Sequence, residues 1–243
     1  INIINEIIST RPSSILSLVT LKSKRNSRIK KLIDLAKSEK IKVSFKNESF
    51  FKKYFPGLLH QGVAILCRKR IEENESFIDY LLQKRKKILL LILDHLTDPH
   101  NVGACLRTSA AAGADAIIVP KNRACHLTSV VRKISSGGSE LIPFVIVTNI
   151  VRTIKKLRTN GVKVLGASKG GGMNVAEIDL SECSTAFVIG SENKGLKMLT
   201  AKHCETLISI PMPGQLESLN ASVSAGILLF EYLRQNKRTN SKL

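Results

Sequence analysis

Short apolar runs alternate with helical patterns from Ile88 to the end of the chain. The apolar runs, each of strand length, lie at residues 88–94, 115–119, 143–147, 162–166, 185–190 and 206–211. Residues 103–112, 150–159 and 221–235 carry apolar side chains at helical spacing. Because the strands are apolar almost throughout, we expect both of their faces to be covered. The pattern therefore predicts an α/β fold with a mostly parallel sheet between two layers of helices.

A smaller pattern of the same kind occupies the beginning of the chain. We expect strands at residues 14–21 and 41–45, a helix at 27–37 and a buried strand at 62–67, whose sequence GVAILC is apolar throughout. Residues 68–87 are rich in charge and are expected to be a linker with a short helix around 77–82. The predicted organisation is thus a small α/β domain at 1–67, a linker at 68–87 and a larger domain at 88–243.

The charge of the chain indicates a polyanionic partner. The 243 residues include 38 Lys and Arg against 19 Asp and Glu, which gives a formal net charge of +19. Nucleic acid is the first candidate, an anionic membrane surface the second, and a merely basic surface the third. No apolar run is long enough to span a membrane. A basic cluster lies on and before the first predicted helix, and we favour phosphate contacts over a solvated helix face for its members: Lys22, Lys24, Arg25, Arg28, Lys30 and Lys31.

The five cysteines indicate a reducing compartment rather than a disulfide framework. They are scattered, odd in number and never spaced C-x-x-C. Cys125 lies beside His126, and Cys204 beside His203, but adjacent side chains of a helix or strand point apart. We therefore expect no disulfide and no metal, and place the protein in the cytoplasm or an organelle matrix.

Polar residues gather where three of the predicted strands end, which is where ligands bind in α/β sheets. In the first block, residues 93–113, a buried strand ends at Asp94 and a turn follows at Asp98–Pro99. A helix then opens near Asn101 and is capped by Gly113. Its interior is full of small residues, so another element must pack closely against it. Arg107 stands out there, and its small neighbours favour a placed guanidinium over an ordinary surface charge.

The second block is VIGSENKGLK, residues 188–197. A strand delivers Gly190, and we expect Gly195 to open a helix five residues later. Backbone N–H groups in such a turn can hold a carboxylate or the polar edge of an adenosine. Glu192 inside the turn would repel a phosphate. Neither the phosphate-binding P-loop pattern nor a well-placed dinucleotide fingerprint occurs, which argues against a nucleotide-dependent dehydrogenase.

The third block, residues 208–235, runs from a strand end at Ile210 through a loop into a strongly apolar helix. Ser218, Leu219 and Asn220 lead into that helix. Either Ser218 or Asn220 could be the helix N-cap, since both side chains can accept a backbone N–H.

Taken together, the three blocks resemble the motifs of the SpoU (TrmH-like) branch of the SPOUT methyltransferases. The segments that carry the resemblance are DPHNVGACLR (98–107), IGSENKG (189–195) and SLNASVSAGILLFE (218–231), and the match spans about residues 88–236. The segment HQGVAI (60–65) is similar to the N-terminal RNA-binding domain of the members that methylate a guanosine of 23S ribosomal RNA. That subgroup places a ribosomal-protein-like α/β domain before the catalytic one.

The resemblance implies several properties that the pattern alone does not. It implies a SPOUT catalytic domain with a C-terminal trefoil knot, a homodimer, and methylation of a ribose 2′-hydroxyl in RNA. S-Adenosylmethionine would bind in the knot, held mainly by backbone around Gly190, Gly195, Ile210 and Leu219. The family's functional polar positions are matched by Arg107, Asn101, Glu192, Ser218 and Asn220.

The chemistry of the expected reaction limits what Arg107 can do. Methyl transfer to a ribose hydroxyl is an in-line displacement, so alignment supplies much of the acceleration. The guanidinium is a poor base at neutral pH, because its pKa lies above about 12. We therefore expect Arg107 to orient the RNA phosphate and stabilise the developing alkoxide. Asn101 and Ser218 would position Arg107 or the ribose, and Glu192 would fix the local network.

Two other functions remain open from the sequence. A transfer-RNA 2′-O-methyltransferase would share all three motifs, although a separate α/β domain at residues 1–67 points toward ribosomal RNA. A non-enzymatic RNA-binding or ribosome-assembly factor could use the same scaffold. The five polar residues that match the family's functional positions argue against such a non-enzymatic factor.

Overall fold

The computed structural model describes residues 1–22, 26–57, 60–170, 172–191, 194–215 and 218–236, and it divides the chain into two compact units. The first unit is Ile1–Arg70 and the second is Ile71–Leu243. Within the ranges given, no helix is long and apolar enough to cross a membrane.

The first unit is a three-stranded sheet with helices. Its elements are α1 (Asn2–Thr10), the short 3₁₀ helix η1 (Pro12–Ser14), β1 (Ile15–Leu21), α2 (Ser27–Ser38), β2 (Val43–Lys46), α3 (Glu48–Tyr54) and β3 (Val63–Cys67). The strand order is β2-β1-β3, with β2 parallel and β3 antiparallel to β1. Ile8, Leu18, Leu32 and Phe51 are fully buried and form the centre of this core.

Two details of this unit differ from expectation. The helices α1 and α3 were not predicted, although Asn47 caps α3 by accepting from the backbone N–H of Phe50 at 3.2 Å. The strand at 62–67 was expected to be buried, and this is wrong: Val63 is buried but Leu66 is exposed. The reason is that β3 lies at an edge of a small sheet, where helices cover only part of its surface.

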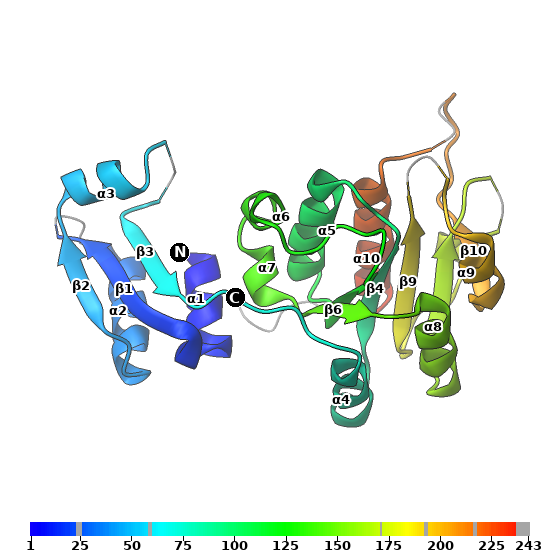
Figure 1. Ribbon diagram of the computed structural model, residues 1–243, viewed down its shortest axis with the longest axis horizontal. Coiled ribbons are helices and arrows are strands. Elements are labelled where there is room, and N and C mark those ends of the chain that lie inside the picture. Colours follow the sequence, from blue (N-terminus) through cyan, green and yellow to red (C-terminus); the bar gives the residue numbers. More distant parts are fainter. Residues whose placement is uncertain (23–25, 58–59, 171, 192–193, 216–217, 237–243) are drawn as a thin grey trace. The chain divides into compact units, whose positions relative to one another are not determined.

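The second unit is built on a parallel sheet, as predicted, with seven strands where six were expected, because the short strand β8 was not predicted. Its strands are β4 (Leu89–Asp94), β5 (Ala116–Pro120), β6 (Phe144–Val147), β7 (Lys163–Ala167), β8 (Met173–Asn174), β9 (Thr185–Gly190) and β10 (Thr206–Ser209). They are arranged in the order β6-β5-β4-β9-β7-β10-β8 and are joined by parallel pairings (Figure 1). The trefoil knot stays a prediction.

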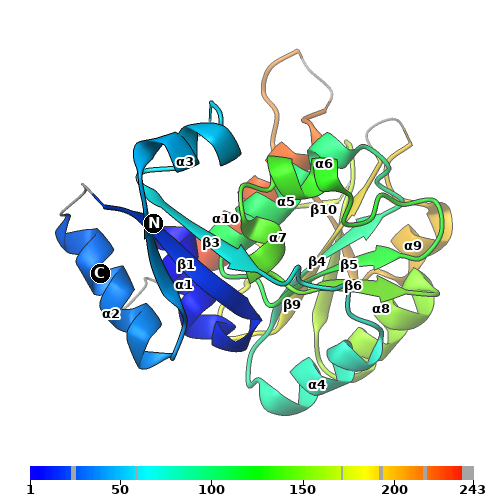
Figure 2. The same cartoon turned by 60° about the vertical axis from the view of Figure 1, so that its left-hand side comes forward.

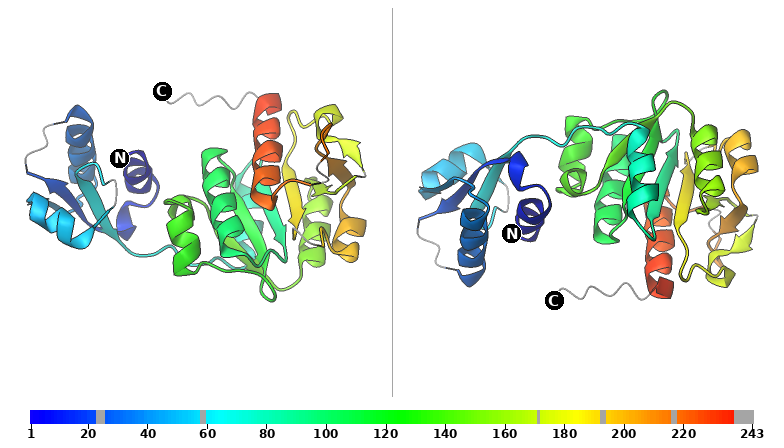
Figure 3. Two further views of the ribbon diagram at one scale, coloured as in Figure 1. Left: turned by 90° about the horizontal axis from the view of Figure 1, so that it is seen from above. Right: turned by 90° about the horizontal axis from the view of Figure 1, so that it is seen from below.

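Helices cover both faces of this sheet, which confirms the layered α/β architecture (Figure 3). The helices are α4 (Ser76–Lys84), α5 (Pro99–Ala111), α6 (Ser129–Ile134), α7 (Gly138–Leu141), α8 (Ile150–Thr159), α9 (Met198–His203) and α10 (Ala221–Asn236), with the 3₁₀ helix η2 at Val175–Glu177. Side chains of β4 alternate between the faces. Leu89, Leu91 and Leu93 pack with α5 and α10, whereas Leu90 and Ile92 pack with α4 and α8. Each such leucine stabilises the fold by about 1.5–3 kcal/mol.

The stretch expected to be a linker contributes to the second unit. Ile78 and Leu81 of α4 are buried in its core, and α4 contains the short helix expected around 77–82. Glu73 joins the edge of the sheet, because its backbone N–H donates to the carbonyl of Phe144 at 2.8 Å.

The small residues of α5 allow close packing, as expected. A Cβ at Gly103 would lie 2.7 Å from the Cβ of Ile134 on α6. On α7, a Cβ at Gly138 would lie 2.8 Å from the carbonyl oxygen of Leu106. Helices α6 and α7 therefore lie very close to α5, and a larger side chain at either glycine would prevent this packing.

Two helix starts differ from the prediction. Helix α5 begins at Pro99 rather than near Asn101, because Asp98 is the N-cap and accepts from the backbone N–H of His100 at 3.0 Å. Gly195 opens no helix, since α9 begins only at Met198. Gly195 instead has φ +63° and closes a turn in which its N–H donates to the carbonyl of Ser191 at 2.8 Å.

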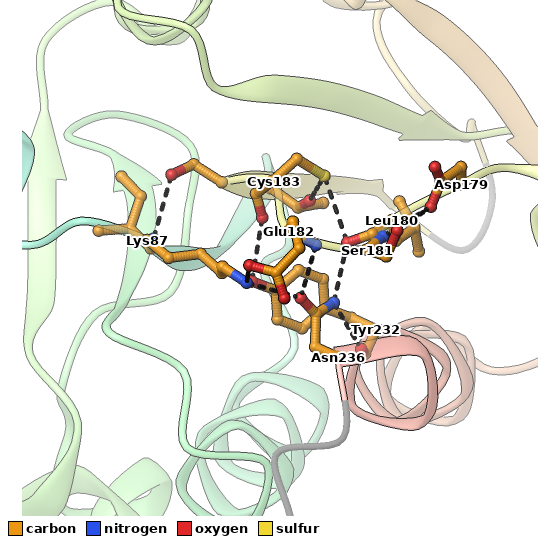
Figure 4. A network of polar contacts seen from close by, with 11 residues as sticks. Lys87, Asp179, Leu180, Ser181, Glu182, Cys183, Tyr232 and Asn236 are labelled. Atoms are coloured by element: carbon orange, nitrogen blue, oxygen red, sulfur yellow. Dashed lines mark hydrogen bonds and ion pairs between the residues drawn. The ribbon is translucent and has the colours of Figure 1, made fainter.

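The far end of α10 is fixed by a polar network (Figure 4). The amide of Asn236 donates to the carbonyl of Leu180 at 2.8 Å, and its oxygen accepts from the backbone N–H of Glu182 at 3.2 Å. Lys87, just before β4, donates to the carboxylate of Glu182 at 2.8 Å. The hydroxyl of Tyr232 donates to the carbonyl of Cys183 at 3.1 Å. These bonds hold α10 against the turn that precedes β9.

Candidate active site at the strand ends

A cavity of about 320 Å³ opens at the carboxyl ends of β7, β9 and β10. Its lining comes from the segments that follow these strands and from the first turns of α10. The lining residues are Ala167, Ser168, Lys169, Ile189, Gly190, Ser191, Lys194, Gly195, Leu196, Ala201, Ile208, Ile210, Met212, Ser218, Leu219, Ala221, Ser224 and Leu228. Parallel neighbours end at the same edge of a sheet, which explains why segments far apart in the sequence meet here.

Gly190 lets the loop after β9 fold back onto the strand end. A Cβ at this position would lie 2.1 Å from the backbone carbon of Gly195, which no side chain tolerates. The left-handed backbone of Gly195 completes the same turn. The two glycines are thus required by the shape of the cavity wall.

All four residues expected around the cofactor line this cavity: Gly190, Gly195, Ile210 and Leu219. Ser218, expected among the functional polar residues, lines it too. Glu192 lies outside the described residues. The roles of these residues stay predictions.

Two predicted polar residues meet outside the cavity lining. The amide nitrogen of Asn220 donates to the side-chain oxygen of Asn101 at 2.9 Å, across 119 positions of sequence. The oxygen of Asn220 accepts from the backbone N–H of Ser222 at 2.9 Å, so Asn220 is also the residue that caps α10. The contact ties the first turn of α5 to the start of α10.

The remaining predicted residue is Arg107. It is exposed on α5, six positions after Asn101, and does not line the cavity. Among the described residues, no carboxylate forms an ion pair with its guanidinium. A charge in this position is open to a ligand that approaches from outside the protein.

A polar network beside the cavity was not expected from the sequence. The buried carboxylate of Asp94, at the end of β4, contacts Nδ1 of His95 at 2.5 Å and accepts from the backbone N–H of Lys197 at 2.9 Å. Nε2 of His95 lies 2.7 Å from Nζ of Lys197. A carboxylate only accepts and an ammonium only donates, so a neutral imidazole with its proton on Nδ1 satisfies both partners.

This network closes the loop that forms the cavity wall. Asp94 pairs with Gly190 in the β4–β9 register, and its side chain binds Lys197 at the other end of residues 190–197. The strand end at Asp94 was a signal in the sequence, but nothing in the sequence marked His95.

Ser168, Lys169 and Lys194 were also missed as lining residues. Ser168 and Lys169 directly follow β7, so the rule that ligands gather at strand ends could have found them. Lys194 belongs to the segment that follows β9 in the same way.

The buried thiols have no part in nucleophilic chemistry. Burial raises the pKa of Cys105 to about 12, and burial together with the charge of Asp94 raises the pKa of Cys204 to about 12. Both stay protonated at neutral pH. Within the described ranges, no group of three or more His, Cys, Asp and Glu side chains could hold a metal ion.

Comparison with known families agrees with the fold and with the motifs. Residues 88–230 match the SpoU rRNA Methylase family, and residues 1–72 match the family described as RNA 2′-O ribose methyltransferase substrate binding. The chain therefore belongs to the SpoU rRNA methylase family and is an RNA 2′-O-ribose methyltransferase, which confirms the resemblance found in the sequence.

Within that class, the chain is similar over its length to curated bacterial enzymes. It is 40% identical over 236 residues to the 23S rRNA (guanosine-2′-O-)-methyltransferase RlmB of Haemophilus influenzae, which covers 97% of this chain and 96% of that protein. It is 37% identical over 242 residues to the RlmB of Neisseria meningitidis, with 99% and 95% coverage.

Solved structures show the same fold. The SpoU methyltransferase AviRb of Streptomyces viridochromogenes, in complex with AdoMet, superposes with a TM-score of 0.69 at 21% identity and covers 96% of this chain and 87% of that one. An AdoMet-bound rRNA methyltransferase of Sinorhizobium meliloti gives a TM-score of 0.68 at 23% identity, with 96% and 85% coverage.

Proposed function

We propose that this enzyme methylates the ribose 2′-hydroxyl of a guanosine in 23S ribosomal RNA, with S-adenosylmethionine as the methyl donor. The observation that carries the proposal is the cavity at the ends of β7, β9 and β10, in a chain similar over almost its full length to enzymes of that name. The basic first unit, matched by a substrate-binding family, supports RNA as the acceptor.

The cavity suits S-adenosylmethionine in size and chemistry. Its volume of about 320 Å³ lies within the range for small-molecule sites. Ile210, Leu219 and Leu228 offer apolar contacts for an adenine ring, and Lys169 and Lys194 can face a carboxylate. When bound, the cofactor supplies a methyl group on a positively charged sulfur.

The protein's own residues would orient the acceptor. Asn101 and Asn220 hold the starts of α5 and α10 together, which fixes the cavity rim where Ser218 and Leu219 lie. Arg107, exposed on α5, binds an RNA phosphate and stabilises the negative charge that develops on the attacking oxygen. The guanidinium stays protonated, so it acts as a fixed charge and not as the base.

We further propose that the enzyme is a homodimer that acts in the cytoplasm. An apolar stripe on the outer face of α10 supports the dimer: Val223, Ile227 and Phe230 are 48%, 37% and 50% exposed, at positions i, i+4 and i+7. Exposed apolar stripes of this kind mark interaction surfaces. Five free cysteines support a reducing compartment.

Transfer of a radiolabelled methyl group to purified RNAs tests the function. The substrates are 23S rRNA transcripts, a total tRNA pool and 16S rRNA, and the modified position is mapped by resistance to alkaline cleavage. We expect label in 23S rRNA, at a guanosine. Label in tRNA instead would replace the ribosomal substrate with the tRNA alternative. The absence of cofactor binding by calorimetry would favour a non-enzymatic RNA-binding factor.

A further inference from the structure

Most of the positive charge of the chain lies in its first unit. Residues 1–70 contain sixteen Lys and Arg and four Asp and Glu, so they carry +12 of the formal net charge of +19. Charge of this kind anchors a phosphate backbone but cannot distinguish one region of an RNA from another. A contact that recognises bases needs a different kind of side chain.

Helix α3 presents aromatic side chains on two sides. Phe51 points into the core, is fully buried and stacks on His60 with ring centroids 4.6 Å apart. Phe50 and Tyr54, four positions apart, form the other side, and their rings also lie 4.6 Å apart. Tyr54 is 58% exposed. Packing of the core thus explains the aromatic residue at Phe51 but not the one at Tyr54.

Two lysines flank these outer rings. Nζ of Lys46 lies 5.6 Å from the ring centroid of Phe50, and Nζ of Lys53 lies 5.5 Å from that of Tyr54. Both lysines are exposed, and neither forms an ion pair with a carboxylate of the described residues. Contacts between an ammonium and an exposed ring are weak, so each lysine can turn to a phosphate while its ring receives another group.

We propose that the α3 aromatic surface, defined as Lys46, Phe50, Lys53 and Tyr54, binds unpaired nucleotides of the RNA substrate. A base stacks on Tyr54, beside Phe50, and the two lysines contact the adjacent phosphates. In a duplex every base is already stacked between its neighbours, so a surface tyrosine can accept only a base from a loop, bulge or end. The proposal deepens the proposed function, on which it rests, by naming the part of the RNA that the first unit recognises.

The charge of the surface decides between RNA and a protein partner. An exposed tyrosine could also be covered by another protein. The lysines beside both rings, in a unit with a fourfold excess of basic over acidic residues, favour an anionic occupant. Aromatic rings interleaved with basic side chains are the composition that single-stranded nucleic acids require.

Binding of two labelled RNAs, measured by fluorescence anisotropy without cofactor, tests the proposal. One RNA is a hairpin with an unpaired loop and the other is a fully paired duplex with the same stem. We expect Tyr54→Leu to weaken hairpin binding about 5- to 100-fold and to leave duplex binding unchanged. Tyr54→Phe keeps a ring and should bind the hairpin nearly as the wild type does. Lys53→Gln should make hairpin binding less dependent on salt concentration, by the amount expected for the loss of about one phosphate contact.

Tyr80→Leu is the matched control. Tyr80 is 53% exposed on α4 of the second unit, where its ring lies 5.7 Å from that of Phe77. It should leave binding of both RNAs unchanged. Melting temperatures of all variants report on folding.

Two results would overturn the proposal: wild-type hairpin binding by Tyr54→Leu, or equal loss of hairpin and duplex binding. Normal RNA binding by Tyr54→Leu with impaired methylation of ribosomal particles would assign the surface to a protein partner. Because binding is read without methyl transfer, failure of the proposed reaction and failure of this surface are distinguishable.

Discussion

At the scale of single residues, Arg107 combines an exposed guanidinium with a backbone held very close to another helix. A Cβ at Gly138 would lie 3.0 Å from the Cα of Arg107, so α7 packs directly on this turn of α5. The backbone is therefore fixed while the side chain faces outward. That combination suits a residue that acts on a ligand from outside the cavity at the strand ends.

Arg107→Ala should reduce methyl transfer about 100- to 1000-fold, because the charge that we propose to stabilise the developing oxyanion is lost. Cofactor affinity by calorimetry and the melting temperature should stay near wild type, since the side chain is exposed and does not line the cavity. Lys133→Ala, which removes an exposed charge from α6, serves as the control. Near-normal turnover of Arg107→Ala would contradict the assigned role.

His95 adopts a left-handed backbone, with φ +61°, while its ring links Asp94 to Lys197. Such a backbone suits glycine better than histidine. His95→Gly should therefore leave the free energy of unfolding within about 1 kcal/mol of wild type. Loss of the ring should weaken the attachment of Lys197 to the end of β4 and raise KM for S-adenosylmethionine roughly fivefold or more, with a smaller effect on kcat.

Arg123→Gly is the control for the change in backbone. Arg123 is exposed and has φ +56°, but it does not line the cavity. Steady-state kinetics should show a normal KM for the cofactor in this variant. An unchanged KM in His95→Gly would mean that Asp94 and the backbone of Lys197 hold the loop without the ring.

At this scale, the sequence indicated individual residues but not their contacts. The residues Gly190, Gly195 and Ser218 were expected at the site, and all three line one cavity. The hydrogen bond between Asn101 and Asn220 joins residues 119 positions apart. No local sequence rule predicts that two polar residues so far apart will contact each other. His95 carried no signal, because its role depends on a partner about a hundred residues away.

At the scale of elements, α10 is apolar on both sides. Ala225, Leu228, Leu229 and Tyr232 are fully buried against the sheet, and the outer stripe of Val223, Ile227 and Phe230 is exposed. A helix of an isolated domain normally has a polar outer face. The outer stripe of α10 therefore fits a helix that a second copy of the chain covers.

Ile227→Lys should convert the dimer to a monomer, because it places a charge in the middle of the apolar stripe. Sedimentation velocity or light scattering after gel filtration measures the change. Tyr80→Lys, on α4 of the opposite face of the sheet, should remain dimeric. A wild-type protein that is monomeric at micromolar concentration would contradict the proposed homodimer.

Strands were predicted more accurately than helix starts. The six strands expected in the second unit are all present. A strand that is buried on both faces has a continuous apolar sequence, so it can be recognised from the sequence alone. The start of α5 was missed by two residues, since Asp98 was expected in a turn and is the N-cap. Gly195 was expected to open a helix but adopts a left-handed turn, a choice set by its packing on Gly190.

At the scale of the whole molecule, the charges and the cavity belong to different units. The first unit carries most of the net positive charge, and the cavity is formed within the second. The helices and strands of each unit can be followed in Figures 1 and 2. Each unit has its own buried core. This division matches the separate family models for substrate binding and methylation.

The sequence by itself determined the α/β class, the polyanionic partner and the family, because these depend on periodicity, composition and motifs that are local in the chain. Tertiary structure alone decided the rest. The parallel sheet brings residues 167–169, 189–191, 194–196 and 208–212 to one edge and so creates the cavity. It also joins Asp94 through His95 to Lys197, and leaves Arg107 outside the lining of that cavity. Such contacts depend on strand order, which no local pattern of residues encodes.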